Sequence, residues 1–190
     1  PVHLMSNAKV ENGVLHLSGH DEWVEVYRSR NVELNGKALT ISFDVKPGKL
    51  SGTHEGAAYI TKGNTQFGVV QKGSDKLQFY LHSGVKHTLD VDLPANWMGN
   101  WHHVTASWDS KEMKLYIDGE LKGTETTAPQ ASNNNGRRGN QSGERGVLSN
   151  FPYPINIGRF AGNHAQDPQT IYTADAEMDN VAIYDKCLAD

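Results

Sequence analysis

The sequence predicts an all-β fold, a sandwich or a barrel, from three observations. Short runs of residues alternate between apolar and polar side chains, which is the period of a half-buried strand. Gly and Pro residues end these runs at intervals of about 8–12 residues, as in sandwiches and barrels. No stretch shows the period of an amphipathic helix, and the last residues, DKCLAD, are too short to form one.

The clearest strand is predicted at residues 39–45, where every second residue is apolar. Residues 104–108 repeat that pattern, and residues 113–123 predict a hairpin because Asp118-Gly119 suits a type I′ turn. About a dozen strands are expected, from residues 14–17 and 23–26 to residues 155–160 and 176–184. In a sandwich, five side chains of the central strands should be buried between the sheets: Val104, Ala106, Trp108, Leu115 and Ile117.

Length and composition exclude several classes of protein. The 190 residues suit one domain, and the net charge of −4 leaves no basic stripe for nucleic acid. No apolar run is long enough for a membrane-spanning helix, and the single Cys187 excludes an internal disulfide. The chain starts with neither Met nor a signal peptide, so we expect a piece of a longer protein.

Three blocks of sequence carry a family resemblance: residues 10–26 (VENGVLHLSGHDEWVEV), residues 100–124 (NWHHVTASWDSKEMKLYIDGELKGT), and INIGRF with AEMDNVAIYDKCL near the end. Together they resemble the laminin G-like branch of the concanavalin A-like lectin/glucanase superfamily. The resemblance implies one two-sheet antiparallel β-sandwich, a jelly roll, over residues 1–190. Two features depart from the family pattern: Asn180 replaces the usual Glu after Asp179, and the Asn- and Gly-rich loop of residues 126–154 has no counterpart.

Some relatives with this fold are glycoside hydrolases, which carry two carboxylates on one strand. Asp90 and Asp92 share a face, but their neighbours do not resemble the catalytic strand, so we expect a solvated pair and no catalytic residue. His102 and His103 point to opposite faces of a strand and so do not form a metal pair.

The candidate sugar site is placed on loop residues, because most aromatic side chains on the strands are expected to pack in the sandwich core. Trp23, Trp101 and Trp108 lie in strand blocks and are expected to pack in the core or on a sheet. Trp97 lies in the loop LPANWMGNW, where its ring either stacks on a pyranose or covers the end of the sandwich. The polar and aromatic partners proposed for it come from other loops: Arg137, Tyr153, Asn163 and His164.

The resemblance also implies one structural Ca²⁺ where the first and last strands meet. Asp179 matches the family's closing-strand acid, and Asp21 is a second candidate ligand. In the alternative interpretation, Asp179 accepts hydrogen bonds from backbone amides at a sheet edge.

These observations lead to a functional hypothesis: a non-catalytic carbohydrate-binding or accessory module of a larger glycoside hydrolase, of the β-galactosidase type among others. The resemblance implies a glycan and the parent catalytic domain as partners, and a secreted, periplasmic or cell-surface location. A protein-interaction or adhesion module is one alternative, which a large exposed apolar patch would favour. A structural spacer is the other, which burial of Trp97 would favour.

Overall fold

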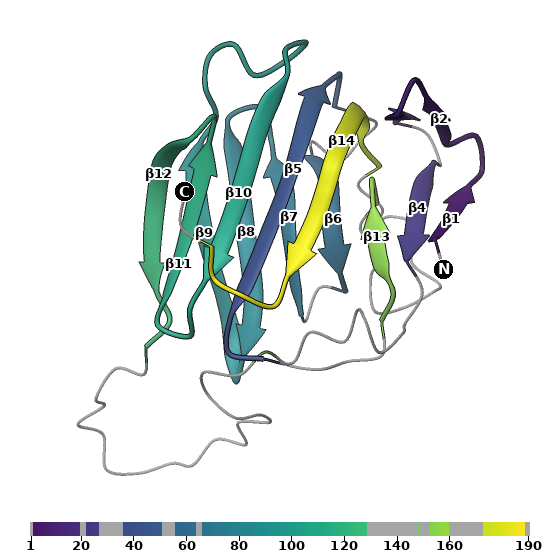
Figure 1. The fold of residues 1–190 in the computed structure, drawn as a ribbon. Helices are drawn as coiled ribbons and strands as arrows, with labels where there is room; N and C mark the ends of the chain where they lie inside the picture. The colour runs from purple at the N-terminus through teal and green to yellow at the C-terminus, as the bar shows by residue number, and fades with distance from the viewer. Residues whose placement is uncertain are drawn as a thin grey trace.

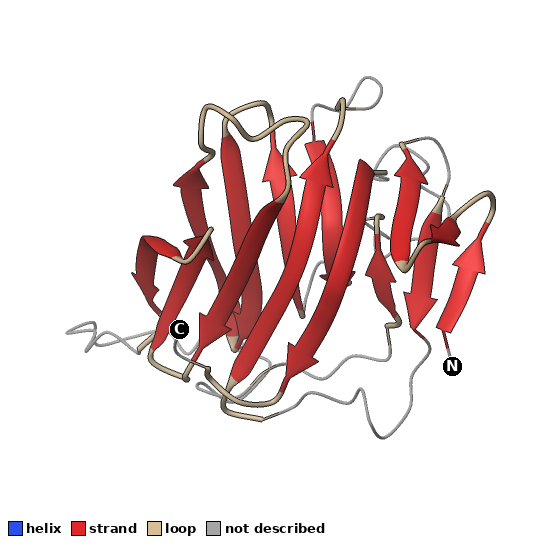
Figure 2. Cartoon of the chain, turned by 45° about the horizontal axis from the view of Figure 1, so that its top comes forward, coloured by secondary structure: helices blue, strands red, loops and turns tan. Residues whose placement is uncertain are grey.

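The computed structural model describes residues 2–19, 22–26, 36–50, 56–63, 66–128, 148, 153–159 and 173–188. Arg137, Asn163, His164 and Asp21 lie outside these residues. Within the described residues, two antiparallel sheets of seven strands each form the fold, and no helix is present. Figure 2 shows both sheets in one colour for strands, joined by loops. The predicted all-β sandwich is therefore confirmed.

Sheet A lies behind sheet B in Figure 1. In spatial order, the strands that sheet A contains among the described residues are β1 (Val2–Met5), β4 (Trp23–Val26), β13 (Ile155–Ile157), β6 (Gly56–Lys62), β7 (Phe67–Lys72), β8 (Lys76–Ser83) and β9 (Val85–Asp92). Those that sheet B contains are β12 (Glu120–Thr126), β11 (Glu112–Ile117), β10 (His102–Trp108), β5 (Leu39–Pro47), β14 (Asp175–Tyr184), β3 (Val14–Ser18) and β2 (Lys9–Glu11). The last strand of the chain, β14, thus lies between β5 and β3, a strand from near the start of the chain.

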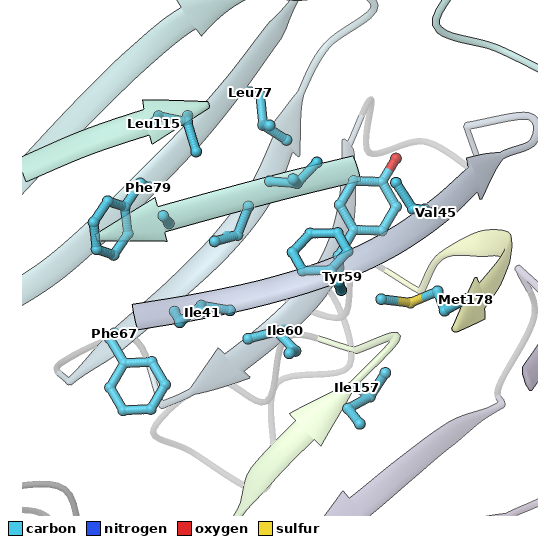
Figure 3. Packing of buried hydrophobic residues seen from close by; sticks show 14 of the residues in the cluster. Ile41, Val45, Tyr59, Ile60, Phe67, Leu77, Phe79, Leu115, Ile157 and Met178 are labelled. Atoms are coloured by element: carbon cyan, nitrogen blue, oxygen red, sulfur yellow. The ribbon is translucent and has the colours of Figure 1, made fainter. Parts of the chain in front are cut away.

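The core lies between the sheets and is built from alternate residues of each strand. In β5, Leu39, Ile41, Phe43 and Val45 are fully buried, as their period of two predicts. Figure 3 shows Ile41, Val45 and Leu115 of sheet B facing Ile60, Leu77 and Phe79 of sheet A. The five residues predicted to be buried are confirmed: Val104, Ala106, Trp108, Leu115 and Ile117.

The predicted hairpin at residues 113–123 is also confirmed. Asp118 and Gly119 join β11 to β12 with φ values of 53° and 78°. Both central residues of a type I′ turn need positive φ, which Asp tolerates and Gly adopts freely.

The segment after β14 covers part of the outer face of sheet B. Thr40 on β5 donates a hydrogen bond to the Lys186 carbonyl (2.6 Å) and accepts one from the Leu188 amide (2.9 Å). In Figure 1 this segment crosses the lower part of β5 and β10. The upper part of this face, where β5 ends and where β10 and β14 begin, carries the candidate site.

Candidate functional site

The loop of residues 93–101 joins β9 of sheet A to β10 of sheet B and holds two tryptophans. Trp97 is 2% exposed and belongs to the core. Its indole Nε1 donates to Gln71 Oε1 at 2.9 Å, and the same oxygen accepts from the Tyr59 hydroxyl at 2.7 Å. The prediction that Trp97 stacks on a sugar is therefore wrong, because its ring fills the end of the sandwich and offers no face to a ligand.

One face of the Trp97 ring is covered by the His102 imidazole, which stacks on it at 4.8 Å between ring centroids. His102 Nε2 lies 3.0 Å from the Asn96 carbonyl oxygen, and Nδ1 lies 2.7 Å from Asp118 Oδ2. Although partial burial opposes it, the hydrogen bonds from the His102 ring and the His103 amide hold the pKa of Asp118 below its usual range. His102 thus packs inside the sandwich and ties this loop to the β11–β12 turn.

Trp101 lies at the other end of the same loop and is 46% exposed. The prediction that it packs in the core or on a sheet is wrong. It borders a cavity of about 340 Å³ whose other walls are Asp44 on β5, His102 and His103 on β10, and Asp179 on β14. An exposed aromatic ring therefore stands beside an open cavity lined with charged and imidazole side chains.

Strand register explains why these side chains meet. His103 lies opposite Asp44, and Asp44 lies opposite Asp179, so the three form one row across β10, β5 and β14. The next residues, Val104 and Phe43, form the next pair and are fully buried. Side chains alternate between the two faces of a sheet along each strand. The apolar row points into the core, so the neighbouring polar row points out to solvent.

Hydrogen bonds orient this row. His103 Nδ1 lies 2.6 Å from Asp44 Oδ1 and donates to it, since a carboxylate only accepts. His103 Nε2 lies within hydrogen-bond distance of the hydroxyls of Ser42 and Thr105, both at 3.2 Å. The imidazole ring is thus fixed in one orientation at the cavity wall.

Asn180 holds the second oxygen of Asp44, since its Nδ2 donates to Asp44 Oδ2 at 2.7 Å. Asn180 lies in a β-bulge of β14 with φ of 50°, a conformation that Asn adopts more readily than Glu. The departure of this sequence from its family at residue 180 therefore has a structural reason.

Asp179 was predicted to ligate Ca²⁺, together with Asp21. Its Oδ1 accepts a hydrogen bond from the Asn180 backbone amide at 2.8 Å, which fits the alternative interpretation of this residue. Both oxygens of the neighbouring Asp44 already have donors. Among the residues that the structure describes, no three His, Cys, Asp or Glu side chains gather as a metal site. The described contacts of Asp179 are those of the hydrogen-bonded interpretation, and a calcium ion held by Asp179 and Asp21 stays a prediction.

Tyr153 lies far from the cavity. It packs at Gly63, where an added Cβ would lie 2.7 Å from the Tyr153 ring. Gly63 follows β6 at one end of sheet A, where Lys62 pairs with Phe67. The 93–101 loop follows β9 at the opposite end of this sheet, where Asp92 pairs with Lys76. The structure therefore does not bring Tyr153 together with either loop tryptophan.

Two further predictions concern side chains of sheet A. Asp90 and Asp92 are both exposed on β9, where Gln78 donates to Asp90 at 2.9 Å and Lys76 pairs with Asp92. This arrangement is the solvated pair that the sequence predicted.

Trp23 is partly buried, and the Arg159 guanidinium lies 4.2 Å from its ring centre, so its ring packs on the sheet as expected.

No helix among the described residues is long and apolar enough to cross a membrane.

The family model for Laminin_G_3, described as the concanavalin A-like lectin/glucanases superfamily, matches residues 18–190. The chain belongs to this superfamily. No curated protein matches this concanavalin A-like domain.

Solved structures similar to this concanavalin A-like domain include binding domains of botulinum neurotoxins. The serotype G binding domain has a TM-score of 0.71 at 15% identity, and the receptor binding domain of the C/D mosaic serotype has 0.68 at 19%. The serotype D ligand binding domain, in complex with N-acetylneuraminic acid, has 0.68 at 18%. Each match covers 100% of this chain and 43–44% of the other, so this chain spans less than half of those proteins. At such identities the likeness shows the fold alone.

Proposed function

We propose that this domain is a carbohydrate-binding module whose sugar site is the cavity beside Trp101. The observation that carries the proposal is an indole ring, 46% exposed, at the rim of a cavity lined by Asp44, His103 and Asp179. The apolar face of a pyranose stacks on a flat aromatic ring, while its hydroxyls need acceptors and donors at the ring's edge. The cavity volume of about 340 Å³ lies in the range of small-molecule sites.

The polar wall suits hydroxyl groups because it is preorganised. Asp44 is held on both oxygens by His103 and Asn180, and His103 is held in turn by two hydroxyls. A ligand therefore does not have to immobilise these side chains on binding, which lowers the entropic cost. The serotype D neurotoxin domain, which has this fold, is in complex with a sugar acid, and that supports a saccharide as ligand here.

We propose further that the domain does not hydrolyse the sugar. Asp44 and Asp179 lie directly opposite each other on neighbouring strands, so two carboxyl groups, the number a glycosidase needs, are present at the cavity. A general acid, however, needs an enclosed apolar setting to stay protonated, whereas Asp44 is partly exposed and accepts two hydrogen bonds as a carboxylate. Incubation with aryl glycosides and polysaccharides should release no reducing sugar. Turnover that Asp44→Asn or Asp179→Asn abolishes would make the domain an enzyme.

As an accessory module, the domain would hold a larger glycoside hydrolase near its polysaccharide substrate. This part of the proposal follows from the family resemblance, since laminin G-like modules accompany catalytic domains such as those of β-galactosidases. A non-catalytic domain with one sugar cavity is what such a role requires.

The test of sugar binding is a glycan array on the purified domain, followed by titration calorimetry with each glycan retained. Trp101→Ala should weaken binding about ten- to hundred-fold, because one stacking ring contributes about 1–3 kcal/mol. Met98→Ala is the matched control, since Met98 is 53% exposed in the same loop and lines neither described cavity. An array without any retained glycan, or equal affinity in the Trp101 variant, would refute the proposal.

A structural spacer is the second candidate function, and the burial of Trp97 favours it. Under that hypothesis Trp101 would pack against the parent enzyme and bind no glycan. The array separates the two, because a spacer retains nothing.

A further inference from the structure

A second cavity lies on sheet B beside the Trp101 cavity. It has a volume of about 440 Å³. Its polar walls come from β3, β5 and β14. Its lining includes residues whose side chains can bond a hydroxyl group: His16, Ser18, Lys46, Asp175 and Glu177. The proposed sugar site does not use any of these residues.

The two cavities lie side by side on the same three structural elements. On β5, Asp44 lines the first cavity and Lys46 the second; on β14, Asp179 lines the first and Glu177 the second. In the loop before β10, Trp101 lines the first and Gly99 the second. Residues two apart on a strand share a face and lie about 7 Å from each other, so the second cavity continues the first along the sheet.

Register places the second group of side chains in a row parallel to the first. Lys46 lies opposite Glu177, and Glu177 lies opposite His16. The row ends at Lys9 on β2, the partner of His16. Neighbouring strands are about 4.8 Å apart, so the distance from β10 across β5 and β14 to β3 is roughly 14 Å, which exceeds the width of one pyranose ring.

Opposite charges are paired within this row. Glu177 accepts from His16 Nδ1 at 3.1 Å and from Lys46 Nζ at 3.4 Å. These three side chains are partly exposed, at 32–42% of their side-chain surface, so each keeps a solvent-facing edge. A row that alternates donor, acceptor and donor, with its charges compensated, suits the hydroxyls of a neutral sugar.

The floor of the second cavity is fixed by the backbone. The Gly48 amide donates to the Asp175 carbonyl at 2.7 Å, and the Gly99 amide donates to the Pro47 carbonyl at 2.7 Å. An added Cβ at Gly48 would lie 2.7 Å from the Asp175 carboxyl carbon. The loop that carries Trp101 is therefore anchored to the end of β5, which keeps the two cavities in a constant relation.

We infer that the second cavity is a second sugar subsite, and that the ligand is an uncharged oligosaccharide lying across β10, β5, β14 and β3. The inference rests on the proposed function, because Trp101 forms the first subsite. Glu177, His16 and Lys46 bind the hydroxyls of a second and a third sugar unit. A single sugar would fill the Trp101 subsite alone and bind weakly.

The experiment is titration calorimetry with ladders of one to five units of β-1,4-linked gluco-, xylo-, manno- and galacto-oligosaccharides. Affinity should rise at least about tenfold from one unit to three and then level off. Glu177→Ala and His16→Ala should remove that rise and leave the affinity for the single unit unchanged. Lys114→Gln is the control on the same sheet, since Lys114 is on β11 and lines neither described cavity; it should bind as the unaltered protein does.

The outcomes separate this inference from the proposed function. Affinity that does not depend on length, or an equal loss at every length in the Glu177 variant, overturns the second subsite and leaves the Trp101 site standing. Tighter binding of uronic-acid oligosaccharides than of neutral ones overturns the assignment of an uncharged ligand. No binding to any ladder or array glycan refutes the proposed function, and the second subsite with it.

Discussion

Trp97 and Trp101 lie in one loop of nine residues, yet one is 2% exposed and the other 46%. Trp97 points into the gap between the sheets, where Gln71, Tyr59 and His102 surround it. Trp101 stands immediately before β10, beside the outer face of sheet B. Two tryptophans of one loop can therefore differ in exposure, because the exposure of each depends on whether its ring fills the gap between the sheets.

The largest expected effect is a loss of stability when the buried tryptophan, Trp97, is truncated. Trp97→Ala should lower the free energy of unfolding by about 3–5 kcal/mol, because it removes a core aromatic ring and leaves a cavity. Trp108→Ala, in the centre of the core, should cost a similar amount. Urea unfolding of both variants measures this, and a loss below about 1 kcal/mol at Trp97 would show that its ring is not a core element.

The hydrogen bonds around Gln71 should have the next largest effect. Gln71→Leu keeps the volume but leaves the Tyr59 hydroxyl and the Trp97 indole N–H without their acceptor. An unsatisfied buried donor costs about 1–3 kcal/mol, so unfolding should become easier by at least that amount. Tyr59→Phe in the same background should recover part of the loss. If Gln71→Leu is neutral in urea unfolding, the network does not hold the loop in place.

Asp118 connects the buried tryptophan to pH through His102. Its pKa is lowered in the folded protein, so the stability that it contributes is present above its ordinary pKa and is lost as pH falls through the lower folded pKa. Asp118→Asn keeps the positive φ of the turn and removes the charge. The melting temperature of the variant should therefore be lower than that of the unaltered protein near neutral pH, and the difference should close as pH falls below the ordinary pKa of an Asp side chain. A gap that stays constant at all pH values would assign the effect to the turn instead.

Removal of divalent metal should have the smallest effect. EDTA should leave the melting temperature unchanged, because Asp44 is already bonded to His103 and Asn180 and Asp179 gains no third acidic neighbour among the described residues. A lower melting temperature in EDTA that Asp179→Ala abolishes would establish a calcium ion at Asp179.

The architecture could be predicted from the sequence because it depends on local patterns. Alternation at residues 39–45 and 104–108 identified both the strands and the faces that they bury. The Asp118-Gly119 turn was recognisable because only a few residue types adopt positive φ at both positions.

The candidate site was missed because it depends on which strands become neighbours. Asp44 and Asp179 are 135 residues apart in the numbering and meet only through the pairing of β5 with β14. One local signal was present: if Val104, Ala106 and Trp108 face the core, the alternation carried back towards the N-terminus places His102 inside and Trp101 and His103 outside. Trp97 has no such pattern, because its place is set by the gap that it fills.

The most direct test of the account follows the side chains of the four tryptophans by NMR during a titration. The indole N–H signals are assigned with the single Trp→Phe variants, and the probe is the tightest-binding trisaccharide of the neutral ladders. We expect the Trp101 signal to shift and reach saturation while the Trp97 signal stays in place, since Trp97 Nε1 is bonded to Gln71 inside the core. A Trp101 signal that does not move while the trisaccharide binds would contradict the site on the outer face of sheet B.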